Sequence, residues 1–184
     1  MRQDPQVIMI AEIRDPETAA IAVQAGLTGH LVISTIHSGS AGGVFARLIN
    51  MEIEPFLLSS SVIGVMGLRL IRKNCPHCTQ PYHPDPVTMK TIGPEYADVG
   101  QYRKGVGCAT CFNTGFGGRS SLTETLVMDE VLRDAVLQKL PTRRLQEIAI
   151  QQGMRTLFEN GMERATRGDT TVEEVLRMVA IDQF

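Results

Sequence analysis

All four cysteines of this 184-residue chain fall into two Cys-x-x-Cys pairs, Cys75 with Cys78 and Cys108 with Cys111. Each such turn places two sulfur atoms close enough to share one ion, and two turns together supply a tetrahedron of ligands. Four thiolates saturate a zinc ion and leave no open coordination position, which is typical of a structural site. The spacing therefore predicts a structural metal site in which these four residues are the ligands and zinc is the expected ion.

Two other arrangements of the cysteines are disulfide bonds and simple packing of the thiols. Disulfides are rare in cytosolic proteins, and the sequence leads us to expect a cytosolic protein. The N-terminal residues have no signal-peptide pattern, and the longest apolar-rich stretch, residues 57–71, is too short and too polar to span a bilayer. A metal is therefore favoured over disulfides, with His77 and His83 as bystanders near the first pair.

The segment around the cysteines, residues 73–120, is rich in proline and glycine, so loops and short strands are expected there. Zinc ribbons of this kind also bind nucleic acids, and residues 69–120 carry seven basic but only three acidic side chains. The whole chain, however, has a net charge of −2, no tryptophan and only 5% aromatic residues, which argues against a base-stacking surface. We expect no nucleic-acid partner and keep a nucleic-acid-binding ribbon as a third hypothesis.

The N-terminal block, residues 1–72, has the pattern of an α/β fold. An apolar run at 7–11 indicates a strand buried on both faces. Asp15 and Pro16 then mark a helix start, and a second strand is expected at 31–36. Strand, helix and strand within about thirty residues predict a parallel pair with a right-handed crossover. Two further helices are expected at 41–51 and 55–73.

The third block, residues 121–184, is expected to be helical. Its expected helix starts and ends are Asp129, Thr142, Gly153, Arg155, Arg167 and a capping box at Thr171 to Glu174. The predicted division is thus a partial α/β domain at 1–72, a four-cysteine metal-binding subdomain at 73–120 and a helical subdomain at 121–184.

Glu12 and two histidines are candidate site residues in the first block. Ligands of open α/β sheets bind at the carboxyl ends of strands, and a carboxylate there can orient a water or hold magnesium. Glu12 ends the first strand, while His30 and His37 bracket the second. A charged residue that ends a strand is also commonplace, so the pattern by itself leaves a catalytic and a structural role open.

A family resemblance covers almost the whole chain. Residues 2–19, with Ala11-Glu12-Ile13-Arg14-Asp15 at their centre, resemble the Walker B segment of the secretion and pilus-assembly ATPases. Residues 28–37 look like the histidine box of that family. The likeness continues through residues 47–51, 54–58 and 69–70, the paired cysteines and residues 115–119. The 54–58 stretch and the intact four-cysteine module favour the type II secretion branch over the pilus motors.

The resemblance implies a RecA-like ATPase domain, a zinc-binding subdomain and a helical C-terminal region. It implies a homo-oligomer, a hexameric ring in the parent protein, that is cytoplasmic, peripheral at the inner membrane and bound to inner-membrane secretion platform proteins. Glu12 matches the Walker B glutamate, which polarises water near magnesium, and His37 is the second expected catalytic residue. Arg14, Asp15 and His30 match positions associated with the nucleotide. The implied cofactors are structural zinc and, in the full-length parent, ATP and magnesium.

No G-x-x-x-x-G-K-[ST] motif occurs in the sequence. Backbone amides and a lysine of such a loop position the phosphates in phosphoryl transfer. We therefore expect a C-terminal fragment of the ATPase, with a truncated parallel sheet, that is inactive alone. The alternatives are a pilus-assembly ATPase fragment and a metal-stabilised interaction module without chemistry.

Overall fold

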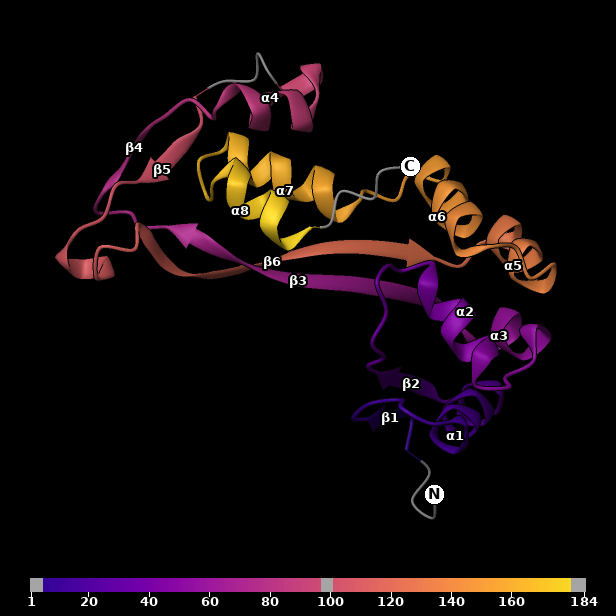
Figure 1. Ribbon diagram of the computed structural model, residues 1–184. Coiled ribbons are helices and arrows are strands. Elements are labelled where there is room, and N and C mark those ends of the chain that lie inside the picture. Colours follow the sequence, from indigo (N-terminus) through magenta and orange to yellow (C-terminus); the bar gives the residue numbers. More distant parts are fainter. Residues whose placement is uncertain (1–4, 97–100, 180–184) are drawn as a thin grey trace. The chain divides into compact units, whose positions relative to one another are not determined.

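The computed structural model describes residues 5–96 and 101–179, which form two compact units (Figure 1). The first unit comprises the residues up to 67 together with 125–154, and the second comprises 68–124 together with the residues from 155 onward. The predicted boundaries at 72 and 120 fall inside strands β3 (Gly64–Asn74) and β6 (Phe116–Val127). The three-part division of the chain stays a prediction.

The first unit begins with the predicted strand, helix and strand: β1 (Val7–Ile10), α1 (Pro16–Leu27) and β2 (Leu31–Ser34). The two strands are parallel, with Val7 opposite Leu31 and Ile10 opposite Ser34. Asp15 caps α1 by accepting a hydrogen bond from the amide of Thr18 at 2.8 Å, and Pro16 supplies a fixed φ where no amide donor is needed. The α/β prediction with a parallel pair is confirmed.

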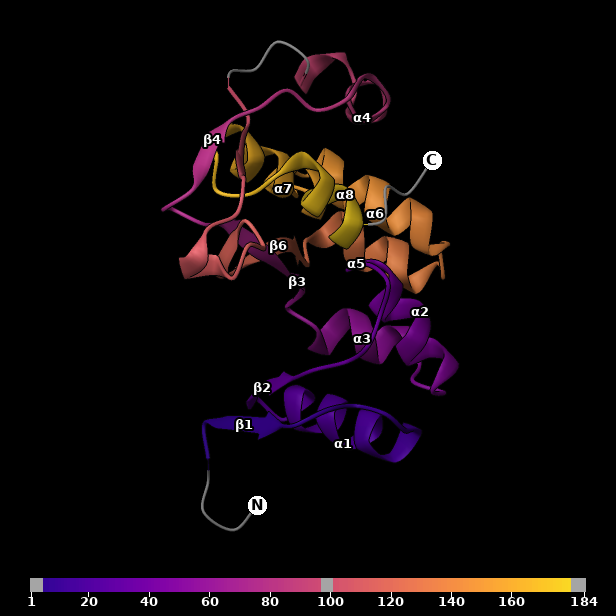
Figure 2. The same cartoon turned by 60° about the vertical axis from the view of Figure 1, so that its left-hand side comes forward.

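The expectation that the first strand is buried on both faces is wrong for the described residues. The side chains of Val7, Met9, Leu31 and Ile33 are exposed, Met9 by 81%, whereas alternate residues such as Ile10 and Val32 pack into the core. The reason is that α1 lies against one face of the two strands (Figure 2). An apolar run predicts a strand but does not report how many of its faces are covered.

Four more helices complete the core of the first unit: α2 (Gly43–Asn50), α3 (Pro55–Ser61), α5 (Glu130–Leu137) and α6 (Thr142–Gln151). Phe45, Leu58 and Leu132 are almost completely buried at its centre. Asp129 caps α5 as predicted, by accepting a hydrogen bond from the Leu132 amide at 2.8 Å. Thr142 is the first residue of α6 and not its cap, which is Pro141.

The predicted helix over 55–73 is only partly correct, because α3 ends at Ser61 and the extended strand β3 follows. This strand pairs with β6. The amide of Met128 bonds to the carbonyl of Ile63, and the amide of Cys75 bonds to that of Gly115, so the two strands are antiparallel. Tertiary pairing with a distant segment overrides the local helical pattern here. Residues 121–127, which were expected to be helical, belong to β6.

The second unit contains β4 (Thr79–Pro81), α4 (Pro86–Ile92), a 3-10 turn at Pro94–Tyr96, β5 (Arg103–Gly105), a 3-10 turn at Ala109–Cys111, α7 (Leu157–Thr166) and α8 (Val172–Met178). Strands β4 and β5 are antiparallel. Figure 2 shows α7 and α8 side by side. Their buried side chains Met162, Val172 and Val175 pack with Ile71 and Leu122 of the long strands.

Only half of the predicted capping box at α8 forms. The Thr171 hydroxyl accepts a hydrogen bond from the Glu174 amide at 3.1 Å, but the buried Glu174 carboxylate turns to two arginines instead. It accepts hydrogen bonds from Arg72 at 2.7 and 3.1 Å and from Arg177 at 2.7 and 2.8 Å. Burial alone would raise the pKa of Glu174, but the hydrogen bonds from Arg177 and Arg72 outweigh it and lower the pKa to about 2.

We predict that Glu174→Gln destabilises the protein at neutral pH. Because the folded-state pKa lies below the unfolded value of 4.5, the stabilisation is present above that pH and is lost as the pH falls toward 2. The shift corresponds to about 3 kcal/mol. Urea unfolding of wild type and variant should differ at pH 7 and converge at low pH. The control is Glu147→Gln, which removes two surface ion pairs, with Arg143 and with Arg144, and should cost clearly less than Glu174→Gln, since exposed pairs contribute about 0–1 kcal/mol each. A Glu174→Gln protein as stable as wild type at pH 7 would contradict the prediction.

Candidate functional site

Three of the predicted site residues, Glu12, Arg14 and His37, are in contact at the carboxyl ends of β1 and β2. One oxygen of Glu12, Oε1, lies 3.2 Å from Nε2 of His37, and the other, Oε2, lies 2.6 Å from Nη2 of Arg14. The Glu12 side chain is 20% exposed, whereas those of His37 and Arg14 are 84% and 74% exposed. A partly sheltered carboxylate is thus flanked by two groups that remain open to a ligand.

Positive groups keep the Glu12 carboxyl ionised. The hydrogen bond from Arg14 lowers the pKa of Glu12, burial opposes this, and the charges of Arg14, His37 and Arg47 lower it further. At neutral pH Glu12 is therefore a carboxylate. Such a group can accept a proton from water or coordinate a hard cation through oxygen.

The side chains of His30 and Asp15, the other two predicted site residues of the N-terminal block, make local contacts away from the Glu12 carboxylate. His30 precedes β2 at its amino end, where its Nδ1 lies 3.1 Å from the Ala25 carbonyl oxygen and 3.1 Å from the Thr28 hydroxyl. Asp15 lies on the Glu12 side, but its carboxylate caps α1 and also accepts a bond from the Thr18 hydroxyl at 3.0 Å. Hydrogen bonds from the Thr18 amide and hydroxyl lower the pKa of Asp15. His30 is not brought to Glu12, and the nucleotide-associated roles of both residues stay predictions.

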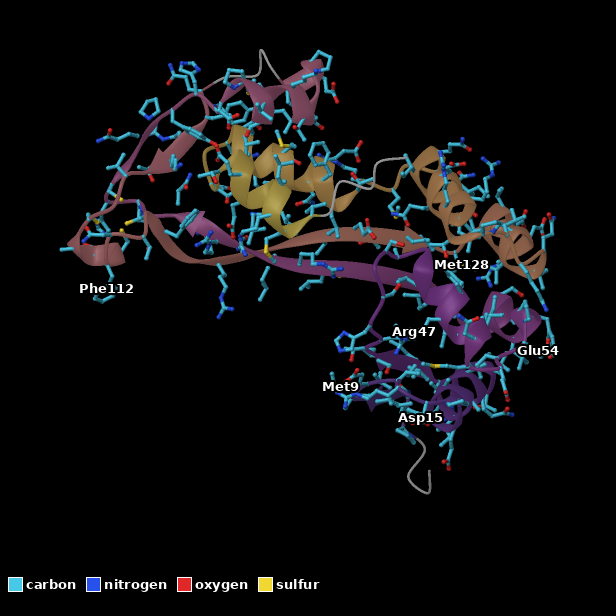
Figure 3. The ribbon with its side chains drawn as sticks, viewed as in Figure 1. Met9, Asp15, Arg47, Glu54, Phe112 and Met128 are labelled. Carbon is cyan, nitrogen blue, oxygen red and sulfur yellow. The ribbon has the colours of Figure 1, made fainter. Side chains whose placement is uncertain are left out.

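An open cavity of about 420 Å³ lies beside His37. Its lining residues are His37, Ser38, Gly39, Gly43, Ala46, Arg47, Asn50 and Met51. Arg47 (labelled in Figure 3) and Asn50 were not among the predicted site residues. They lie three residues apart on α2 and so share one helix face, but only the packing of α2 reveals that this face borders His37.

The four cysteines come together as predicted, with all four sulfur atoms within 4.8 Å of one another. Individual separations are 3.9 Å between Cys75 and Cys108, 3.8 Å between Cys78 and Cys111, and 3.7 Å between Cys108 and Cys111. A tetrahedron of thiolates at the zinc–sulfur distance has edges of about 3.8 Å. The donor set and its spacing therefore fit one tetrahedral metal ion.

Backbone amides also point at the sulfur atoms, as expected where thiolate charge must be stabilised. Gly107 donates to Cys78 at 3.3 Å, and Cys108 and Gly115 donate to Cys111 at 3.2 and 3.3 Å. Burial would raise the pKa of the Cys111 thiol, but these amides and the neighbouring thiols lower it to about 6. Burial raises the pKa of Cys78 to about 11 despite the Gly107 amide. Cys111 is thus ready to bind an ion as a thiolate, whereas Cys78 would release its proton on binding the metal.

Comparison with known proteins decides the family. The family described as "Type II/IV secretion system protein" matches residues 1–177. The chain belongs to this family. It is 46% identical to the Type IV pilus assembly ATPase PilB of Thermus thermophilus over 178 residues, which cover 96% of the chain and 20% of that relative. It is 43% identical to Type II secretion system protein E of Pseudomonas aeruginosa, covering 97% of the chain and 35% of that relative.

The chain spans only about a fifth to a third of the length of the curated relatives it matches. Two solved structures are similar: the ATPase DotB of Legionella pneumophila, with a TM-score of 0.62, and that of Yersinia pseudotuberculosis, with 0.65. Both are 18% identical in sequence, and the match covers 95% and 96% of this chain but 38% and 37% of theirs. This likeness confirms the RecA-like α/β fold. Among the described residues, no helix has the length and apolar character needed to cross a membrane.

Proposed function

We propose that this chain is the C-terminal part of a hexameric ATPase that powers type II protein secretion. The observation that carries the proposal is the Glu12–His37 contact of 3.2 Å at the carboxyl ends of two parallel strands, in a chain of the secretion ATPase family. The carboxyl ends of parallel strands are where α/β folds bind nucleotides. In this proposal Glu12 is the Walker B glutamate, and residues 28–37 are the histidine box.

In this proposal the two oxygens of Glu12 have different tasks. Oε2, held by Arg14, would keep the carboxylate oriented, and Oε1, which lies 3.2 Å from His37, would accept a proton from an attacking water. His37 contacts Oε1 and is exposed, so it can link the position of the carboxylate to groups in the adjoining cavity. ATP with magnesium would supply the transferred phosphoryl group and neutralise its charge when bound.

For the thiolate cluster we propose structural zinc. Four thiolates leave no open position for a substrate or a reactive water, so the metal would hold the loops at 75–78 and 108–111 together. The cysteines are themselves the buried core of this region. A metal would replace the apolar packing that these loops lack.

The partners and location are proposed from the same family membership. We propose a cytoplasmic hexameric ring, peripheral at the inner membrane, that works with secretion platform proteins of that membrane. A pilus-assembly motor is the second candidate, and the 46% identity to a relative named Type IV pilus assembly ATPase favours it. Deletion of the gene separates the two candidates. Loss of protein export would indicate the secretion ATPase, and loss of pili would indicate the pilus-assembly motor.

We predict that the 184-residue chain alone does not hydrolyse ATP. The sequence contains no phosphate-binding loop of the G-x-x-x-x-G-K-[ST] type, so the charges of the β- and γ-phosphates would lack their usual amide and lysine donors. A phosphate-release assay of the purified chain should match a blank, whereas the oligomeric protein that joins this sequence to such a loop should show turnover. Turnover by the chain alone, or none by the longer protein, would contradict the proposal.

A further inference from the structure

The backbone ladder between β1 and β2 changes by one residue at Glu12. Up to Ile10 the register is regular, with Ile10 opposite Ser34, and the Leu31 amide bonds to the Gln6 carbonyl. A parallel ladder continued in this register would direct the Glu12 amide to the carbonyl of Thr35. The Ile13 amide takes that place instead, at 2.8 Å. The first strand thus gains one residue, as in the β-bulges that re-aim side chains beside active sites.

Thr35 makes a second bond at the same point. Its hydroxyl donates to the carbonyl of Ala11 at 2.7 Å. Thr35 therefore binds the backbone on both sides of Glu12. Its hydroxyl bonds to the preceding residue, Ala11, and its carbonyl accepts a bond from the following residue, Ile13. Any amino acid can supply the carbonyl, but the second bond requires a side chain with a hydrogen-bond donor, which here is the hydroxyl of Thr35.

We propose that Thr35 is a positioning residue whose hydroxyl holds the extra residue of the first strand and so aims the Glu12 carboxylate at His37. Thr35 lies two residues before His37 and therefore fixes both partners of the 3.2 Å contact. The charged groups that act on Glu12 are Arg14, His37 and Arg47. In this proposal Thr35 determines the distances from the Glu12 carboxylate to Arg14 and to His37. An effect of Thr35 on ATP hydrolysis rests on the proposed function, whereas its effect on the position of the Glu12 carboxylate does not.

The geometric part is tested in this chain by the NMR titration of the Glu12 carboxyl carbon. Thr35→Val keeps the shape of the side chain and removes the donor, and Thr35→Ser keeps the donor. The wild-type midpoint should lie below 4.5, the valine variant should move toward 4.5, and the serine variant should stay with wild type. If the valine variant does not fold, Thr35→Ala takes its place, because it also lacks the hydroxyl. Equal midpoints in all three proteins, or equal changes in both variants, would overturn the proposal.

The catalytic part is tested in the longer oligomeric ATPase. Thr35→Val should lower kcat on the order of 10-fold to 100-fold, as expected for a misplaced catalytic group, with KM for ATP little changed, and Thr35→Ser should restore the rate. If the wild-type oligomer does not hydrolyse ATP, the proposed function fails while the titration still decides the role of Thr35. If it does hydrolyse ATP and the valine variant keeps its kcat, the positioning role is refuted.

Discussion

Replacing Cys75 with serine is expected to abolish tight metal binding and to loosen both cysteine loops. Structural zinc sites contribute roughly 10–16 kcal/mol of binding energy to folding in small peptides, and the loops at 75–78 and 108–111 have the cysteines as their only buried cluster among the described residues. Elemental analysis should fall from about one ion per chain to almost none. Amide hydrogen exchange should accelerate at Gly107, Cys108 and Gly115, which donate to the sulfur atoms of Cys78 and Cys111.

His77→Ala is the matched control for this experiment. His77 lies between Cys75 and Cys78 and is exposed, so its loss should leave the metal content and the amide exchange unchanged. The Gly107 and Cys108 amides are the informative ones, because they donate to Cys78 and Cys111, whereas the Gly115 carbonyl also accepts a bond from the Cys75 amide. Acceleration at Gly107 and Cys108 therefore reports loss of the shared ion. A serine variant that retains its metal, or a chelated protein with unchanged exchange, would show that the cluster is not a metal site.

Glu12→Gln should reduce ATP hydrolysis by the longer oligomeric protein about 10²-fold to 10⁴-fold, the range found for loss of a general base. The amide keeps the size of the side chain but cannot accept the proton of the attacking water. The affinity for ATP should change little, because the phosphates are held by other groups in this fold. Steady-state phosphate release together with equilibrium nucleotide binding checks both expectations.

Glu17→Gln is the control for the glutamate variant. Glu17 is exposed in the first turn of α1, five residues beyond Glu12, so its variant loses the same charge without touching the contact with His37. Wild-type rates in both variants would exclude Glu12 as the base. A large loss in both would point to a general charge effect.

The sequence was sufficient to predict the cysteine cluster and the placement of Glu12 and His37 at the carboxyl ends of the first two strands, for different reasons. Two Cys-x-x-Cys turns have little conformational freedom once they share an ion, so spacing alone defines the site. Glu12 and His37 lie on the same side because the carboxyl ends of two parallel strands lie at one edge of the pair. Neither prediction required knowledge of distant packing.

Other features depend on packing that a local pattern does not contain. Strand β3 was expected to be helical, since its apolar residues fit either period, and only its pairing with β6 decides the outcome. Glu174 had the spacing of a capping residue, but Arg72, about a hundred residues earlier in the chain, binds its carboxylate. Arg47 joins the cavity because α2 turns this face toward His37.

The most direct measurement is a structure of the longer oligomeric protein with magnesium and a non-hydrolysable ATP analogue. We expect Oε1 of Glu12 to lie within about 2.6–3.2 Å of a water that faces the terminal phosphate, with His37 on the same side. A nucleotide bound elsewhere, or a Glu12 carboxylate that points away from the terminal phosphate, would contradict the assignment of this site.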